Sequence, residues 1–279
     1  MKLFKDDSEL YIWNNVSLEK AFGRVTHFAV AAHQDDVEIM AYHGIAECFG
    51  NKDKGFGAAV VSNGGGSPRG GAYKDYINAQ MIEVRNVEQK KAACIGEYSV
   101  LALLMYQSNE IKDRMNDAVT EDVFKLLTAA KPQVVYTHNL ADRHDTHVGV
   151  ALKTIAAIRK MPKAMRPKQL LGCEVWCGLD WLDNSAKVIL DTSKKPNLAA
   201  GLIGVFDSQI NGGKRYDLAT SARWMTNATY SSSHNVDAYS HVSYAMDLTP
   251  LIDDDTVDIA AFVETHLMNF VKDVKNRLS

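Results

Sequence analysis

Two clusters of histidine and carboxylate side chains stand out in this sequence of 279 residues. The first is His33-Gln-Asp-Asp36, and the second is Asp142-Arg-His-Asp-Thr-His147. Two imidazoles and one carboxylate can hold zinc while one position stays open for water, as in catalytic zinc sites. The same set of ligands also suits Fe²⁺ and other divalent ions. Together the two clusters predict a metal site at which water could be activated.

Each cluster taken alone also has a plainer explanation. An aspartate after a strand often caps the next helix, so a structural role for His33 and the two aspartates competes evenly with metal binding. His144 and His147 alone would more often mark the solvated start of a helix. The presence of both clusters at strand ends of one chain favours the metal site.

Apolar segments next to the clusters predict how they are positioned. Residues 26–32 and 133–137 are short apolar runs, typical of buried parallel strands, and each lies just before one cluster. Ligands of open α/β sheets bind beyond the carboxyl ends of the strands. We therefore expect both clusters at the same edge of one sheet.

The remaining pattern alternates strands with helices. Further strands are expected at 58–62, 100–105, 170–177 and 187–190, and helices after residue 36, over 77–95, 119–130 and 146–160, near 196–209 and from about 257. Such alternation predicts βαβ crossovers. The expected fold is α/β and Rossmann-like, with a mostly parallel sheet flanked by helices, in a single domain over residues 1–279.

A dinucleotide site is the obvious alternative on such a fold, but the first turn argues against it. Asp35 and Asp36 would repel a pyrophosphate at the place where the phosphate cradle needs glycines. The glycine-rich segment 63–71 lacks both the G-x-G-x-x-G order and the GK[ST] ending of a P-loop. It is either a pliable rim over the site or a plain surface loop.

Composition and charge bear on location and partners. The net charge of −3 and the absence of long runs of one sign give no reason to expect nucleic acid or an anionic membrane as partner. No apolar run reaches the roughly 18 residues of a membrane span, and the acidic N-terminus makes a poor signal peptide. The four cysteines lack C-x-x-C spacing, and Cys173 and Cys177 are expected to be buried thiols. We expect a cytoplasmic protein that acts on a small molecule. The sequence is compatible with a homo-oligomer.

Four motifs resemble one family in the right order. Ala32-His-Gln-Asp-Asp36 resembles the Ala-His-Pro-Asp-Asp signature of the PIG-L/LmbE-like deacetylases, which remove acetyl groups from N-acetylglucosamine-containing compounds. Arg85-x-x-Glu88 and His144-Asp-Thr-His147 are similar to its Arg-x-x-Glu helix and its His-Pro-Asp-His motif, and Val242-Ser-Tyr-Ala-Met246 faintly resembles its Tyr-Ala-Glu. The resemblance is best over residues 25–155. Gln34, Asp145 and Thr146 depart from the family pattern.

The resemblance implies a role for each candidate residue. It implies His33, Asp36 and His147 as metal ligands, Asp35 as general base, His144 as oxyanion stabiliser or acid, and Arg85 as a substrate contact, while Asn109 falls where an aspartate that contacts sugar is common. Arg85 has another explanation, since on an amphipathic helix it could be solvated or paired with Glu88 one turn away.

The expected activity is hydrolysis of a linear amide. The cofactor is Zn²⁺, or another divalent metal such as Fe²⁺, which lowers the pKa of a bound water toward ~7 and polarises the carbonyl. A carboxylate can take the proton of that water, and a cationic imidazole can stabilise the oxyanion. The substrate is expected to be an N-acyl, in the first place N-acetyl, amino sugar or sugar conjugate. The alternatives are another amide hydrolase, an Fe²⁺ oxygenase and a non-catalytic sugar-binding relative.

Overall fold

A computed structural model describes all residues from 1 to 279. It contains one sheet of eight strands in the order β1-β4-β3-β2-β5-β6-β8-β7. The strands are β1 Glu9–Tyr11, β2 Val25–Ala31, β3 Gly55–Ser62, β4 Val100–Tyr106, β5 Val134–His138, β6 Gln169–Cys173, β7 Lys187–Asp191 and β8 Val242–Asp247. The five adjacent strands from β4 to β6 run parallel to one another, whereas β1, β8 and β7 pair antiparallel with their neighbours.

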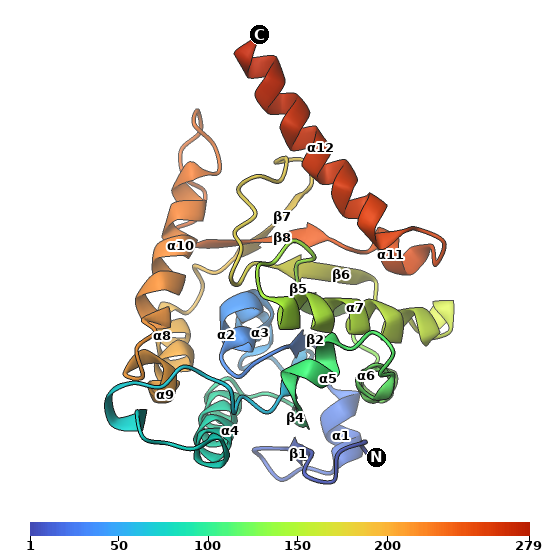
Figure 1. Cartoon of the computed structure of the whole chain (residues 1–279), viewed down its shortest axis with the longest axis vertical. Helices are drawn as coiled ribbons and strands as arrows, with labels where there is room; N and C mark the ends of the chain where they lie inside the picture. The colour runs from blue at the N-terminus through green and yellow to red at the C-terminus, as the bar shows by residue number, and fades with distance from the viewer.

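Helices lie on both sides of this sheet (Figure 1). The helices of the first part are α1 Leu18–Gly23, α2 Asp36–Met40, α3 Tyr42–Cys48, η1 Gly71–Tyr73, α4 Asn78–Ile95, α5 Ser108–Lys112, α6 Ala118–Ala130, α7 Asp145–Lys160 and η2 Lys163–Met165. Those of the second part are α8 Pro196–Gly204, α9 Asp207–Ile210, α10 Tyr216–Tyr230, α11 Pro250–Asp253 and α12 Ile259–Leu278.

Alternate residues of the central strands enter two separate cores. In β2, Phe28 and Val30 pack with α6 and α7, while Ala29 and Ala31 pack on the opposite face with α2, α3 and α8. A strand that is buried on both faces reads as an unbroken apolar run, which is why these strands could be located in the sequence. The predicted α/β fold with a mostly parallel sheet flanked by helices is confirmed.

Several elements differ from the expectation in their bounds. The strand expected over 170–177 ends at Cys173, and the helix expected near 196–209 is divided into α8 and α9. The helix expected after residue 36 is likewise divided, at Ala41, into α2 and α3. Neither α10 nor β8 was expected. The contacts that bury them come from distant parts of the chain, namely β6 and β7 for β8.

The C-terminal helix α12 is poorly buried for its length. None of its residues is buried, and in Figure 1 it projects away from the sheet. No helix of the structure is both long and apolar enough to cross a bilayer. All four cysteines are free thiols, and Cys173 is buried in β6 whereas Cys177 is partly exposed.

Candidate metal centre and pocket

The two clusters lie together at one edge of the sheet. The strands β2 and β5 are parallel neighbours, with Ala29 opposite Tyr136, so the loops that follow them leave the sheet on the same side. His33 and Asp36 come from the first loop and from the start of α2, and His147 comes from the first turn of α7. Over a hundred residues of sequence separate groups that are in contact.

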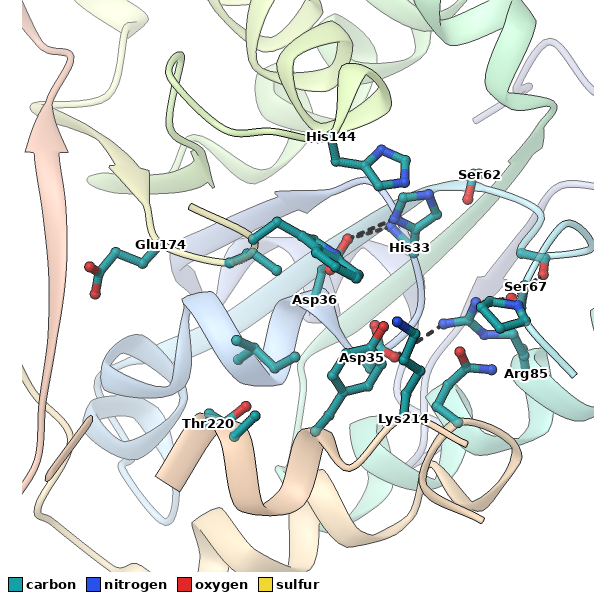
Figure 2. Close-up of a pocket in the computed structure, with 18 of the residues that line it drawn as sticks. His33, Asp35, Asp36, Ser62, Ser67, Arg85, His144, Glu174, Lys214 and Thr220 are labelled. Atoms are coloured by element: carbon teal, nitrogen blue, oxygen red, sulfur yellow. Dashed lines mark hydrogen bonds and ion pairs between the residues drawn. The ribbon is translucent and has the colours of Figure 1, made fainter. Parts of the chain in front are cut away.

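Three side-chain atoms converge in this corner. The Nδ1 atom of His33 lies 3.1 Å from the Oδ2 atom of Asp36 and 3.1 Å from the Nε2 atom of His147. The same Asp36 oxygen lies 3.3 Å from His147 Nε2, which closes a nearly equilateral triangle. Figure 2 shows His33 and Asp36 facing each other in the pocket.

The donor set fits a tetrahedral divalent ion. Zinc takes imidazole and carboxylate ligands at roughly 2.0–2.1 Å, which puts the ligand atoms of a tetrahedral site roughly 3.3 Å apart. The three separations above match this spacing. Three lone-pair donors crowded so closely call for a positive charge between them.

Electrostatics at the site points the same way. Burial acts to lower the pKa of His147, but Asp36 and Asp142 outweigh it and raise the pKa to about 9. Burial acts to raise the pKa of Asp36, yet the neighbouring His147 and His33 hold it well below its usual range. The site thus favours a positive charge, whether it is a proton or a metal ion.

His138, at the end of β5, is a buried member of the cluster that the sequence did not single out as a ligand. Its ring stacks on that of His147, with centroids 3.9 Å apart. With Asp36 and His147 it forms a second group that could hold a metal. However, its Nε2 atom already accepts the backbone N–H of Ala32 at 2.8 Å. The lone pair is therefore in use, and we assign His138 a structural role.

Asp142 orients His147 from behind. Its Oδ1 atom lies 3.3 Å from His147 Nδ1 and accepts the backbone N–H of His144 at 2.9 Å. Its Oδ2 atom accepts the backbone N–H groups of Trp176 and Cys177 at 3.1 and 3.3 Å. Carboxylate partners of this kind fix the tautomer and the direction of a ligating imidazole. The sequence contained Asp142 in its second cluster but gave no signal of this role.

Asp35 stands in a strained turn beside the triangle. Its φ of 85° lies in the left-handed region, which non-glycine residues seldom adopt. Gln89 stabilises the turn by accepting the Asp35 backbone N–H at 3.2 Å. Burial raises the pKa of the Asp35 carboxyl well above its usual range, and the cation of Arg85 opposes this in part.

Arg85 is buried on α4, where it contacts Asp35 rather than Glu88. Its Nη2 atom lies 3.2 Å from the Asp35 carboxylate and donates to the carbonyl of Gln34, while its Nη1 atom donates to Ser67 Oγ. The explanation of Arg85 as a solvated residue or a Glu88 partner is therefore wrong. Glu88 instead accepts hydrogen bonds from the backbone N–H and the hydroxyl of Ser208, at 2.7 and 2.6 Å.

His144 caps the N-terminus of α7 and lines the pocket. Its Nδ1 atom accepts the backbone N–H of Thr146 at 3.3 Å, so in the neutral ring the hydrogen sits on Nε2. Burial, and then His33 and His147, lower the pKa of His144 below 6.5. The lowered pKa favours the neutral ring over the expected cationic imidazole, and the neutral ring can still donate through its Nε2–H. His144 also forms a possible metal-binding group with His33 and His147.

A pocket of about 540 Å³ opens over the triangle. Its lining includes His33, Asp35, Asp36, Arg85 and His144. The glycine-rich segment 63–71 forms part of its rim, which agrees with the first of the two expectations for that segment. Glycine is favoured at position 64, because its φ of +71° lies in the left-handed region, where any side chain would be strained, and a Cβ there would also meet the Gln34 side chain. Asn109 is exposed on α5 and does not line the pocket, whereas its neighbour Ser108 does.

The far wall of the pocket comes from residues beyond 165, which the sequence left without a role. Trp176 follows β6, and Lys214, Tyr216 and Arg223 belong to α10 and the loop before it. Figure 2 shows Lys214 extending toward the middle of the pocket.

The sequence matches one protein-family model, described as PIG-L: GlcNAc-PI de-N-acetylase, over residues 28–158. Residues 28–158, a little under half of the chain, are thus similar to the PIG-L family. This confirms the resemblance seen in the motifs, and the matched segment holds all residues of the triangle together with Asp35, Arg85 and His144. No curated protein sequence gives a significant match to the chain.

Several solved structures share the PIG-L-type fold of this chain. The conserved protein TT1542 from Thermus thermophilus has a TM-score of 0.61 and 17% identity, covering 84% of this chain and 99% of that one. N,N′-diacetylchitobiose deacetylase from Pyrococcus horikoshii has a TM-score of 0.64 and 13% identity, covering 88% and 92%. GalB, the 4-carboxy-2-hydroxymuconate hydratase from Pseudomonas putida, has a TM-score of 0.62 and 14% identity, covering 80% and 96%. At these identities the likeness shows the fold.

Proposed function

We propose that this protein is a metal-dependent hydrolase that removes an acyl group, in the first place acetyl, from an N-acyl amino sugar or its conjugate. The observation that carries the proposal is the triangle of His33, Asp36 and His147, two of whose members line a pocket together with Asp35 and His144. The family match supports the choice of an N-acetyl sugar. A fold alone does not decide a reaction, and a hydratase shares this one.

In this proposal the triangle holds a divalent ion, Zn²⁺ or another such as Fe²⁺. When bound, such an ion polarises a carbonyl oxygen and lowers the pKa of a water molecule. His33 and Asp36 line the pocket, so an ion held by the triangle would be accessible to a substrate there, whereas His138 and Asp142 contact Asp36 and His147.

Asp35 is the proposed general base. Its carboxylate lines the pocket next to Asp36, and burial raises its pKa, which makes it a stronger base than an exposed carboxylate. The ion pair with Arg85 holds one carboxylate oxygen in place. After Asp35 has taken the proton of the attacking water, it can return that proton to the nitrogen of the leaving amine.

His144 is the proposed oxyanion donor. Its Nδ1 atom is occupied by the backbone of α7, so the ring is fixed and its Nε2–H is available to a ligand. A fixed donor aimed at the developing charge costs no reorganisation during the reaction. Arg85 would read polar groups of the substrate from the same wall, as the family resemblance implies.

The test is an activity screen with defined metals. The purified protein, loaded separately with Zn²⁺, Fe²⁺ or Mn²⁺, is incubated with N-acetyl hexosamines and their conjugates, and free amine and acetate are measured. We expect equal amounts of the two products with at least one metal, and none from an Asp35→Asn variant that still binds that metal. Oxygen consumption without amine release would indicate an oxygenase. Binding of sugars without any turnover would indicate a non-catalytic sugar-binding protein.

A further inference from the structure

The lining of the pocket contains one cation that has no carboxylate partner. Arg85 is paired with Asp35. Arg223 donates to the carbonyl of Val175, and its charge acts on the buried carboxylate of Glu174. Lys214, by contrast, has no carboxylate within 4.0 Å of its ammonium group, and that group donates no hydrogen bond within the protein.

The Lys214 ammonium lies over an aromatic ring. It is 5.1 Å from the ring centroid of Trp176, and the ring of Tyr216 stands nearly perpendicular to that of Trp176, at 6.4 Å and 83°. Trp176 is 41% exposed although it lines a pocket. Two rings at a right angle and one unpaired ammonium thus form a corner with an apolar surface and a single positive charge.

This corner is placed to meet the part of a substrate that lies beyond the reacting amide. The rings of His144 and Trp176 are 6.3 Å apart between centroids. A ligand whose acyl carbonyl lies at His144 would place its next ring against the indole, and a substituent on that ring would reach Lys214. Pockets of this kind combine aromatic walls with a few polar groups that set specificity.

We propose that Lys214, Trp176 and Tyr216 bind an anionic group of the substrate, a carboxylate or a phosphate, so that the natural substrate is an acidic N-acyl amino sugar. The inference rests on the proposed function, whose substrate class it narrows. An unpaired ammonium with three free donors gains most from an anion, since charge-assisted hydrogen bonds are the strong ones.

The position of these residues in the chain agrees with a role in specificity. All three lie outside the segment 28–158 that matches the family model, whereas the metal centre lies inside it. The chemistry of this protein is therefore contributed by the family segment, and the choice of substrate by the part that follows it.

The test compares one neutral and two acidic compounds of the same sugar. N-acetylglucosamine, its 6-phosphate and N-acetylmuramic acid, which carries a carboxylate, are given to the zinc-loaded protein. We measure kcat/KM from amine release and Kd by calorimetry. At least one acidic compound is expected to be preferred over the neutral one by about tenfold. The two acidic compounds distinguish a phosphate from a carboxylate.

Two variants assign the preference to Lys214. Lys214→Met keeps most of the length of the side chain but removes the charge, and it should reduce the preference for the acidic compound toward one. Lys272→Met, which alters an exposed lysine on α12, is the matched control and should keep the preference. The preference of the wild-type protein should also decrease as salt rises from roughly 50 to 500 mM, because salt screens a partly exposed pair.

The outcomes separate this inference from the proposed function. Turnover without any preference for an acidic compound, or a preference that survives Lys214→Met, overturns the inference and leaves the hydrolase proposal standing. Selective binding of an acidic compound that Lys214→Met abolishes, without turnover of any compound, overturns the hydrolase proposal and supports the anion site. Failure of both acidic compounds to bind better than the neutral one overturns the inference.

Discussion

Asp142 offers a sharp test of how the metal centre is built. It touches no substrate position, yet its Oδ1 atom faces His147 Nδ1 at 3.3 Å. Its other oxygen accepts two backbone N–H groups, those of Trp176 and Cys177. The substitution Asp142→Asn keeps the size of the side chain and replaces one acceptor oxygen by an NH₂ donor.

The expected loss of metal affinity depends on which hydrogen-bond donors lose their acceptor oxygen. An amide oxygen that stays with the two backbone N–H groups of Trp176 and Cys177 leaves the NH₂ group facing His147 Nδ1 and the backbone N–H of His144, which then loses its acceptor. That arrangement favours the tautomer with its hydrogen on Nε2, the atom that must offer a lone pair to the ion. A hydrogen bond to a charged group contributes about 1.5–3 kcal/mol, and each 1.4 kcal/mol is about tenfold in affinity. We therefore expect metal affinity to fall about 10- to 100-fold, the usual effect of losing such a partner.

The assay is competition for zinc between the protein and a chromogenic chelator. Asp145→Asn is the matched control, since Asp145 is an exposed aspartate in the same first turn of α7. It should bind zinc like the wild-type protein, and excess zinc should restore the activity of Asp142→Asn. A zinc affinity of Asp142→Asn within twofold of the wild type would show that Asp142 only anchors the Trp176 loop, and would refute the reasoning.

Four further substitutions test the other roles. Asp35→Asn should keep the metal but lose most of the activity, and excess metal should not restore that activity. Asp36→Asn should bind the metal more weakly, and excess metal should partly restore its activity. The reverse pattern in metal titrations would exchange the two roles. His144→Ala should keep the metal and lower kcat about 100- to 1,000-fold, and release of the metal in elemental analysis would instead place His144 in the ligand set. Burial raises the pKa of Glu38 from 4.5 to about 7. Between these two pH values the folded state keeps a proton that the unfolded state has lost. The free energy of unfolding should therefore fall by up to about 3 kcal/mol as the pH rises from 4.5 to about 7. Glu38→Gln should remove this decline in urea unfolding between pH 5 and 8, and an unchanged decline would show that another group is responsible.

The sequence by itself determined the parallel half of the sheet and the location of the site. Strands such as β2 and β5 are buried on both faces, so their burial is written locally as apolar runs. The polar residues directly after such strands must lie at one edge of the sheet. Local sequence patterns were therefore enough to predict that His33 and Asp36 lie close to His147.

The antiparallel part of the sheet and helix α10 were not predicted, because their buried residues do not form a regular apolar pattern in the sequence. The buried face of α10 contains Thr220 and Asn227 beside Trp224 and Ala228, so its apolar period is interrupted. In β8, the buried Ser243 breaks the apolar run in the same way. Asn227 is tolerated there because a residue distant in sequence, Glu174, accepts a hydrogen bond from its side chain.

Only the tertiary structure decided how the individual side chains of the site are used. Arg85 and Asp35 are fifty positions apart, and Asp142 and Trp176 thirty-four. No local pattern says that Arg85 pairs with Asp35 rather than Glu88, or that Ala32 takes up the lone pair of His138. The type of a residue sets which hydrogen bonds it can make, but the partner is chosen by the packing of strands and loops that are remote in sequence. The same holds for Lys214, whose lack of a partner is a property of the folded pocket.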